Sequence, residues 1–398
     1  MRVAGMSVTT PLGFRAAGVA AGLKASGNPD VALVVNDGPE HTAAAVFTTN
    51  RVLAAPVLWT RQATGDGRID AVVLNSGGAN ACTGSDGFAD THRTAEHVAA
   101  VLTEMGSNVS SLDVAVCSTG LIGERLPMPA LLAGVDAAAA ALDARGGPAA
   151  AAAIMTTDTE AKQAVATGQG PDGAVFTVGG MAKGAGMLAP GLATMLVVLT
   201  TDAEAEAVIL DTVLRAAVAV SFDRVDSDGC MSTNDTVLLL ASGASGVRPD
   251  PAELGDAVRS VCLDLAMQLL HDAEGASHDI AIEVVNAASK ADAVEVGRAV
   301  ARSNLFKCAV FGNDPNWGRI LAAVGTTDAA FNPYALDVSF NGVWVCRDGG
   351  MGEPRDKVDL TGRQVHVVID LKAGQAAATI WTNDLTTAYV HENSAYAT

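Results

Sequence analysis

The sequence predicts a layered α+β protein with a smaller second unit towards its C-terminus. Strand-like apolar runs and helix-like stretches intermingle along the 398 residues, without the strict alternation that a doubly wound parallel sheet requires. After about residue 280 the strand-like runs become denser, and the length itself suggests two domains or one large one. We therefore expect a main domain over residues 1–280 and a C-terminal α/β domain over 281–398.

Short apolar runs predict the strands, and longer stretches of good helix formers predict the helices. The strand-like runs are Val31–Val35, Ala43–Phe47, Ile69–Leu74, Val114–Cys117, Met195–Leu199, Thr236–Leu240, Ile280–Val285, Leu336–Phe340, Val365–Ile369 and Ala376–Trp381. The helix-like stretches are Thr91–Met105, Pro129–Arg145, Ala203–Phe222, Pro251–Asp272 and Lys290–Ser303. The alanine-rich segment Leu131–Ala153 is also interpreted as helical, since alanine is the best helix former.

The composition excludes several classes of protein. With 44 acidic and 25 basic residues the net charge is −19, so the chain repels the phosphates of nucleic acids and of anionic membranes. Hydrophobic residues make up 49% and charged residues 17%, the reverse of a disordered chain. Neither a run of 18 apolar residues nor the apolar core of a secretory signal is present, so we expect a cytoplasmic protein.

The pattern of cysteines and histidines predicts no metal site. The six cysteines lie far apart, and the seven histidines are isolated, without a His-Glu-x-x-His motif. The acidic segment 223–228 lacks the spacing of a calcium loop. The phosphate-binding glycine motifs and the Gly-x-Ser-x-Gly elbow of hydrolases are missing as well.

The strongest chemical signal is a glycine-rich segment before an apolar run. Five glycines, Lys183 and Pro190 lie within residues 179–194, and Thr194 stands at the start of the run Met195–Leu199. Three interpretations stay open: a phosphate-binding loop, a tight loop leading into a buried strand, or a strained peptide bond beside a nucleophilic hydroxyl. Cleavage before Thr194 would free an α-amine that can act as the general base.

Further polar clusters are candidates for lining a site. The segments Asn75–Gly84 and Cys117–Gly123 each follow a predicted strand. Within the second, Thr119 and Gly120 can aim a hydroxyl and an N–H at one point, as an oxyanion site requires, although an ordinary turn fits as well. The segment Met155–Thr159 offers hydroxyls and a carboxylate, either for an amino acid substrate or for a helix cap.

Three more segments have both a structural and a functional interpretation. The segment Ser232–Thr236 fits the support of an active site or turn chemistry. Glu274, at a predicted helix end, is either a solvated acid or a group that recognises a substrate ammonium. The corner Asp314–Arg319 leaves Arg319 available for a carboxylate or a subunit contact.

In their order along the chain, these segments resemble the ArgJ family, the bifunctional ornithine acetyltransferase and glutamate N-acetyltransferase of arginine biosynthesis. The resemblance covers nearly the whole chain, from Gly13–Gly18 to Glu392–Tyr396. Its most specific element is Lys-Gly-x-Gly-Met-x-Ala-Pro-x-x-Ala-Thr-Met at 183–195. One departure is His278, where many members carry a lysine.

The resemblance implies a precursor that cuts itself between Ala193 and Thr194. Thr194 would then take the acetyl group of N2-acetyl-L-ornithine, release L-ornithine, and pass the acetyl group to L-glutamate in a ping-pong reaction that needs no cofactor. Some members also use acetyl-CoA as a donor. The implied fold is a four-layer αββα sandwich of the self-cleaving DmpA/ArgJ-like type, and the implied assembly is a heterotetramer or larger, built from both fragments.

The resemblance also implies roles for individual residues. Thr194 matches the nucleophile, and Thr119 and Gly120 match the oxyanion hole. The implied substrate contacts are Thr157, Lys183, Thr194, Glu274, Asn393 and Thr398. Two alternatives stay open: a self-cleaving aminopeptidase of the same fold, which would ignore acetylornithine, and an uncut amino-acid sensor that binds without turnover.

Overall fold

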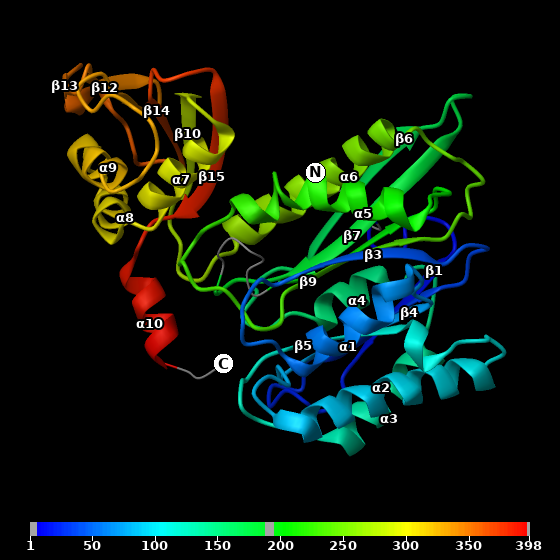
Figure 1. Cartoon of the computed structure of the whole chain (residues 1–398). Helices are drawn as coiled ribbons and strands as arrows, with labels where there is room; N and C mark the ends of the chain where they lie inside the picture. The colour runs from blue at the N-terminus through cyan, green and yellow to red at the C-terminus, as the bar shows by residue number, and fades with distance from the viewer. Residues whose placement is uncertain (1–5, 188–194, 396–398) are drawn as a thin grey trace.

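The main body of the molecule consists of two β-sheets packed face to face, each covered by helices on its outer side (Figure 1). The computed structural model describes residues 6–187 and 195–395. The first sheet contains, in spatial order, β1 (Phe14–Val19), β2 (Val31–Asn36), β4 (Ala71–Ser76) and β5 (Val114–Thr119). The second contains β3 (Thr42–Phe47), β9 (Thr236–Ala241), β8 (Leu196–Thr201), β7 (Val175–Lys183) and β6 (Lys162–Gln169). Only β4–β5 and β8–β9 are parallel among these pairs of described strands.

Apolar cores fill the spaces between the layers. The inner faces of the two sheets meet around Val34, Leu74 and Leu240. The outer helices are α1 (Ala55–Ala63), α2 (Gly84–Glu104) and α3 (Met128–Ala140) on the first sheet, and α5 (Ala207–Val218) and α6 (Pro251–His271) on the second. The layers run helix, sheet, sheet, helix, which confirms the expected α+β sandwich.

A third sheet forms the smaller C-terminal unit. Its strands, in spatial order, are β13 (Gly350–Met351), β12 (Val343–Arg347), β11 (Asp337–Phe340), β14 (Gln364–Asp370), β10 (Asp279–Ala287) and β15 (Ala376–Asn383). The helices α7 (Lys290–Ala301), α8 (Asn304–Phe311) and α9 (Trp317–Val324) share its core. The last described helix, α10 (Thr387–Ala395), leads back towards the main body (Figure 1). This sheet starts two residues before the boundary expected at 281, and the division into domains stays a prediction.

Every predicted strand overlaps an observed one, but two predicted helices are shorter than expected. The stretch Ala203–Phe222 is helical only over Ala207–Val218. The stretch Pro129–Arg145 is helical only to Ala140. Asp143 instead exchanges two backbone hydrogen bonds with Ala16 of β1, each 3.1 Å long. A residue that pairs with a strand edge cannot keep helical geometry, so this contact ends the helix.

The interpretation of the glycine-rich segment as a loop from residue 179 onwards is wrong. Gly179 and Gly180 lie inside β7, which continues to Lys183. A Cβ at Gly180 would lie 2.7 Å from a methyl carbon of Leu199, and a Cβ at Gly179 would lie 2.4 Å from the carbonyl oxygen of Ser7. These glycines therefore serve close packing of the strand rather than a turn.

Small side chains also explain much of the alanine-rich segment. Helix α4 (Gly147–Ala153) buries Ala150, Ala151 and Ala153 in the core between the two sheets. It approaches β1 so closely that a Cβ at Gly18 would lie 2.0 Å from the carbonyl oxygen of Ala149. The alanines thus allow a helix backbone to lie almost directly on a strand.

None of the helices among residues 6–187 and 195–395 has the length and apolar character needed to cross a membrane.

The substitution Gly18→Ala is expected to lower the free energy of unfolding by about 1–3 kcal/mol, because α4 or β1 must move to admit the methyl group. The matched control is Gly65→Ala, since a Cβ at Gly65 meets no atom within 4 Å. Urea denaturation followed by circular dichroism measures both. Equal stability of the two variants would contradict the close approach of α4 to β1.

Candidate active site

A buried lysine joins the ends of two strands from different sheets. Lys183, the last residue of β7, has only 1% of its surface exposed. Its Nζ donates to the hydroxyl of Thr119 at 3.3 Å and to the hydroxyl of Thr156 at 2.7 Å. Since Thr119 is the last residue of β5, the structure brings two of the predicted site residues into direct contact.

The carboxylate of Asp158 lies between two buried lysines. Its Oδ1 accepts from Lys162 Nζ at 2.6 Å and from the N–H of Gly184 at 2.6 Å, while Oδ2 lies 3.9 Å from Lys183 Nζ. Burial alone would raise the pKa of Asp158, but the charges of Lys183 and Lys162 outweigh it and lower that pKa to about 2. Asp158 is therefore ionised at neutral pH.

Lys162 continues this chain of charges to helix α6. Its Nζ also donates to Asp272 Oδ2 at 2.6 Å, directly after the end of α6 at His271. Lys162 thus satisfies two carboxylates, whereas Lys183 makes its closest contacts with hydroxyl groups. Burial lowers the pKa of Lys183, and the attraction of Asp158 opposes that shift. A lysine with a lowered pKa is suited to proton transfer.

The turn after β5 is constrained by the backbone around Gly120. The carbonyl oxygen of Thr119 accepts the N–H groups of Gly77 and Gly78, both at 3.0 Å. Gly120 has φ +131°, and a Cβ there would lie 2.5 Å from the nitrogen of Gly78. Only glycine fits this position. The Asn75 side chain supports the same turn, donating to the Gly78 carbonyl at 3.0 Å.

Glu274 connects the glycine-rich segment with helix α10. Its N–H donates to the carbonyl oxygen of Ala185 at 3.0 Å, and its carboxylate packs against Gly186, where a Cβ would lie 2.7 Å from both oxygens. Asn393 of α10 donates through Nδ2 to Glu274 Oε2 at 3.0 Å. The structure therefore brings the predicted residues Glu274 and Asn393 together. Glu274 packs against Gly186, which follows Lys183 by three positions in the sequence.

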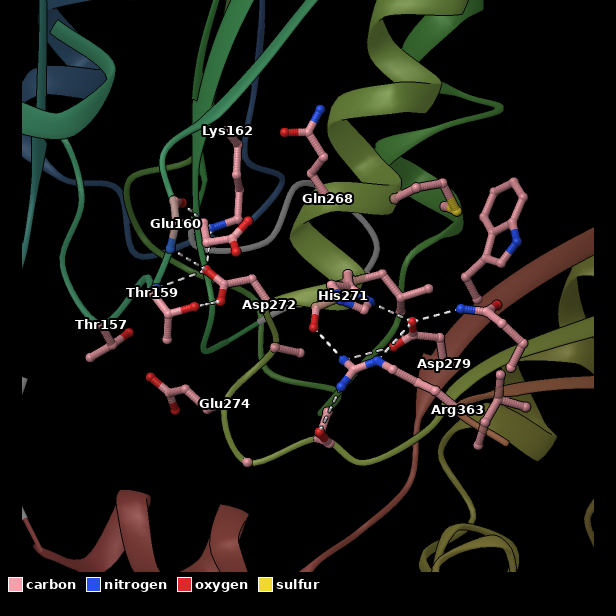
Figure 2. A pocket seen from close by; sticks show the side chains of 18 of the residues that line it. Thr157, Thr159, Glu160, Lys162, Gln268, His271, Asp272, Glu274, Asp279 and Arg363 are labelled. Atoms are coloured by element: carbon pink, nitrogen blue, oxygen red, sulfur yellow. Dashed lines mark hydrogen bonds and ion pairs between the residues drawn. The ribbon is translucent and has the colours of Figure 1, made fainter. Parts of the chain in front are cut away.

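A cavity of about 890 Å³ opens beside this cluster, between the main body and the third sheet (Figure 2). Thr157 and Glu274, both predicted to contact substrate, line it. In the described residues, one lysine and one arginine face six carboxylates along its wall, namely Glu160, Asp264, Asp272, Glu274, Asp279 and Glu392. Such a surplus of negative charge favours a cationic ligand.

Several predicted residues are placed elsewhere or lie outside the described residues. Ala193, Thr194 and Thr398 belong to the latter group. Arg319 donates to the carbonyl oxygen of Leu305 within the C-terminal unit. His278 is buried, with Nδ1 2.7 Å from Asp384 and Nε2 3.0 Å from the Leu360 carbonyl, so its contacts are structural. The described part of the chain shows no cluster of three metal-binding side chains.

The pair Lys162–Asp272 was not predicted from the sequence. The two residues are 110 positions apart, and nothing in their local sequence indicates the contact. The rarity of lysine, with seven in 398 residues, is the one signal that could have drawn attention to Lys162.

Comparison with known proteins supports the resemblance seen in the sequence. The ArgJ family model matches residues 15–398. The "Arginine biosynthesis bifunctional protein ArgJ" of Streptomyces coelicolor is 64% identical over 392 residues, covering 98% of this chain and 100% of that protein. The protein of the same name from Thermobifida fusca is 64% identical over 393 residues, covering 99% of this chain and 100% of that protein.

Among solved structures, the ornithine acetyltransferase complexed with ornithine from Mycobacterium tuberculosis is 56% identical, with a TM-score of 0.44. The match covers 49% of this chain and 98% of that chain. Because the family model spans almost the whole sequence, the chain belongs to the ArgJ family.

Proposed function

We propose that this enzyme of the ArgJ family transfers an acetyl group from N2-acetyl-L-ornithine to L-glutamate through an acetyl-Thr194 intermediate. Its precursor would first cut itself between Ala193 and Thr194, into fragments 1–193 and 194–398. The observation that carries the proposal is the contact of buried Lys183, at the end of β7, with Thr119, at the end of β5. Strand β8 begins beside Lys183, which pairs with Leu196. The names of the relatives from Streptomyces coelicolor and Thermobifida fusca, bifunctional proteins of arginine biosynthesis, support the same pathway.

The start of β8 supports Thr194 as the nucleophile. Lys183 and Leu196 are paired across the antiparallel strands β7 and β8. Met195, which follows Thr194 in sequence, is 2% exposed and bonded through its N–H to Asp235. The chain is therefore anchored one residue after the proposed nucleophile, close to the lysine and the hydroxyl that can assist it.

The self-cleavage step conserves atoms and protons. The hydroxyl oxygen of Thr194 attacks the carbonyl carbon of Ala193, the peptide C–N bond breaks, and the hydroxyl proton passes to the nitrogen. Water then hydrolyses the resulting ester, which leaves a carboxylate on Ala193 and a free amine and hydroxyl on Thr194. The hydroxyl of Thr119 and the N–H of Gly120 would stabilise the oxyanion that forms in each attack.

Acetyl transfer would repeat this chemistry twice. Thr194 attacks the acetyl carbonyl of N2-acetyl-L-ornithine, the amide C–N bond breaks, and L-ornithine leaves with the proton. The amine of L-glutamate then attacks the acetyl ester and restores the threonine hydroxyl, so no cofactor is required. Acetyl-CoA would enter as an alternative donor in the first half-reaction, and assays with each donor in parallel decide whether it does.

The proposed substrate contacts divide by charge. The acid-rich cavity and Glu274 would receive the side-chain ammonium of ornithine, with Asn393 holding the Glu274 carboxylate. Thr157, Lys183 and Thr398 supply hydroxyl and ammonium groups for the remaining polar groups of the substrate. We propose that both fragments stay associated, as a heterotetramer or larger assembly.

Thr194→Ala is expected to leave the precursor as a single chain without acetyl transfer, because the attacking hydroxyl is removed. Denaturing electrophoresis and intact mass should show two fragments for the wild type, with the second beginning at Thr194. Normal processing of the variant would overturn the assignment of the nucleophile. Release of amino acids from peptides, without transfer from acetylornithine, would favour the aminopeptidase alternative.

Glu274→Gln is expected to raise KM for N2-acetyl-L-ornithine about tenfold while kcat changes little, because one charge-assisted contact to the bound ammonium is lost. Gln keeps an oxygen for Asn393, so the local structure is preserved. The matched control is Glu392→Gln, which removes the same charge from the wall of the same cavity. Equal effects of the two substitutions would show that the overall field, and not Glu274, binds the substrate.

A further inference from the structure

The segment Ser232–Thr236 joins three parts of the candidate site. Asn234 donates through Nδ2 to the carbonyl oxygens of Ala79 at 2.6 Å and Ser118 at 2.8 Å, so it bonds to the region where β4 and β5 end. The following residue, Asp235, accepts the N–H of Met195 at 3.0 Å through Oδ1. The segment therefore links the oxyanion turn of the first sheet to the start of β8 in the second.

Met195 is held on both sides by consecutive residues. Asp235 takes its N–H, and the N–H of Thr236 donates to its carbonyl oxygen at 3.2 Å. A parallel pair of strands requires only backbone bonds, so the side-chain bond from Asp235 is an addition to the β8–β9 ladder. This addition fixes the peptide group through which Met195 is joined to Thr194.

The carboxyl group of Asp235 has a second oxygen, Oδ2, that the hydrogen bond to Met195 does not use. The residue is 0% exposed, and its Oδ2 makes no well-formed hydrogen bond within residues 6–187 and 195–395. Burial raises the pKa of Asp235 well above its usual range, outweighing the opposing influence of the Met195 N–H, Ser232 and Lys183. A buried polar atom without a partner is costly, so its retention calls for an explanation.

We propose that Asp235 is a positioning residue for the acyl chemistry of Thr194. Oδ1 fixes the peptide that follows Thr194 in sequence, and Oδ2 of the same carboxyl group stays available at the start of β8. The inference rests on the proposed function and adds a residue to it. A purely structural cap would need one acceptor only, and would contribute to stability without affecting self-cleavage or kcat.

Asp202 provides a matched control at the opposite end of the same parallel pair of strands. It is 3% exposed and accepts the N–H groups of Thr177 at 2.7 Å and Leu12 at 3.1 Å. Burial raises its pKa as well. It is thus another buried carboxyl that bonds backbone N–H groups next to β8, but at the end of that strand away from Thr194.

The test compares precursor cleavage and acetyl transfer in Asp235→Ala, Asp235→Asn, Asp202→Ala and Asp202→Asn, using the full-length chain and N2-acetyl-L-ornithine. Asp235→Ala should slow cleavage and kcat about 10²-fold with little change in KM, as expected for misplaced reacting groups. Asp235→Asn, which keeps the acceptor for Met195, should recover about tenfold of that loss. Asp202→Ala should lower the melting temperature while cleavage and kcat stay near the wild type.

The proposal is overturned by wild-type cleavage and kcat in Asp235→Ala, or by losses in Asp235→Ala that match those of Asp202→Ala. If Asp235→Ala does not fold, the rates of cleavage and acetyl transfer in Asp235→Asn are compared with those in Asp202→Asn. Wild-type rates in both variants overturn the proposal. Cleavage and acetyl transfer are measured in parallel for the wild type and for Thr194→Ala. An uncut or inactive wild type would refute the proposed function, whereas an active wild type with insensitive Asp235 variants would refute only the role of Asp235.

Discussion

The buried carboxylate of Asp158 is the interaction on which the candidate site depends. An ion taken out of water is costly unless it is paired and hydrogen-bonded, and Asp158 is paired with Lys162 and bonded to the N–H of Gly184. Through Lys162 the network reaches Asp272 at the end of α6, and Glu274 follows two residues later. The same carboxylate keeps a charge 3.9 Å from Lys183, so it opposes the effect of burial on that lysine. One anion thus lies next to Lys183 and, through Lys162 and Asp272, is linked to the segment that carries Glu274.

The second constraint is the close approach of backbones, which glycine and alanine permit. Gly180 admits the side chains of α6 against β7, Gly120 admits the turn after β4, and Gly275 lies where a Cβ would be 2.2 Å from the nitrogen of Tyr389 in α10. At each of these positions a side chain would collide with the neighbouring segment. The abundance of small residues in the sequence is therefore a packing requirement at these positions, and the acidity of the chain has a local counterpart in the wall of the cavity.

The sequence predicts the layers and most strands because apolar runs bounded by polar residues leave few other ways to bury them. It misses β1, β6, β7, β12 and β13. In β7, Gly179 and Gly180 argue locally for a loop, and the packing that explains them comes from residues elsewhere in the chain, including Ser7 and helix α6. The roles of the site residues are predicted from the resemblance to a family, and the structure shows contacts of Lys183 with Thr119 and of Asn393 with Glu274. The contacts Lys162–Asp272 and Met195–Asp235 link residues 110 and 40 positions apart, which local patterns do not encode.

The most direct test of the central claim is the rate at which fragment 194–398 becomes acetylated when N2-acetyl-L-ornithine is mixed with enzyme in the absence of glutamate. Intact mass after rapid quenching follows this rate in the wild type, in Asp158→Asn and in the exposed control Asp143→Asn. If the Asp158 carboxylate orders the site, the wild type and Asp143→Asn acquire one acetyl group at the same rate, and Asp158→Asn acquires it about 10²-fold more slowly. Equal rates in all three proteins would contradict the account.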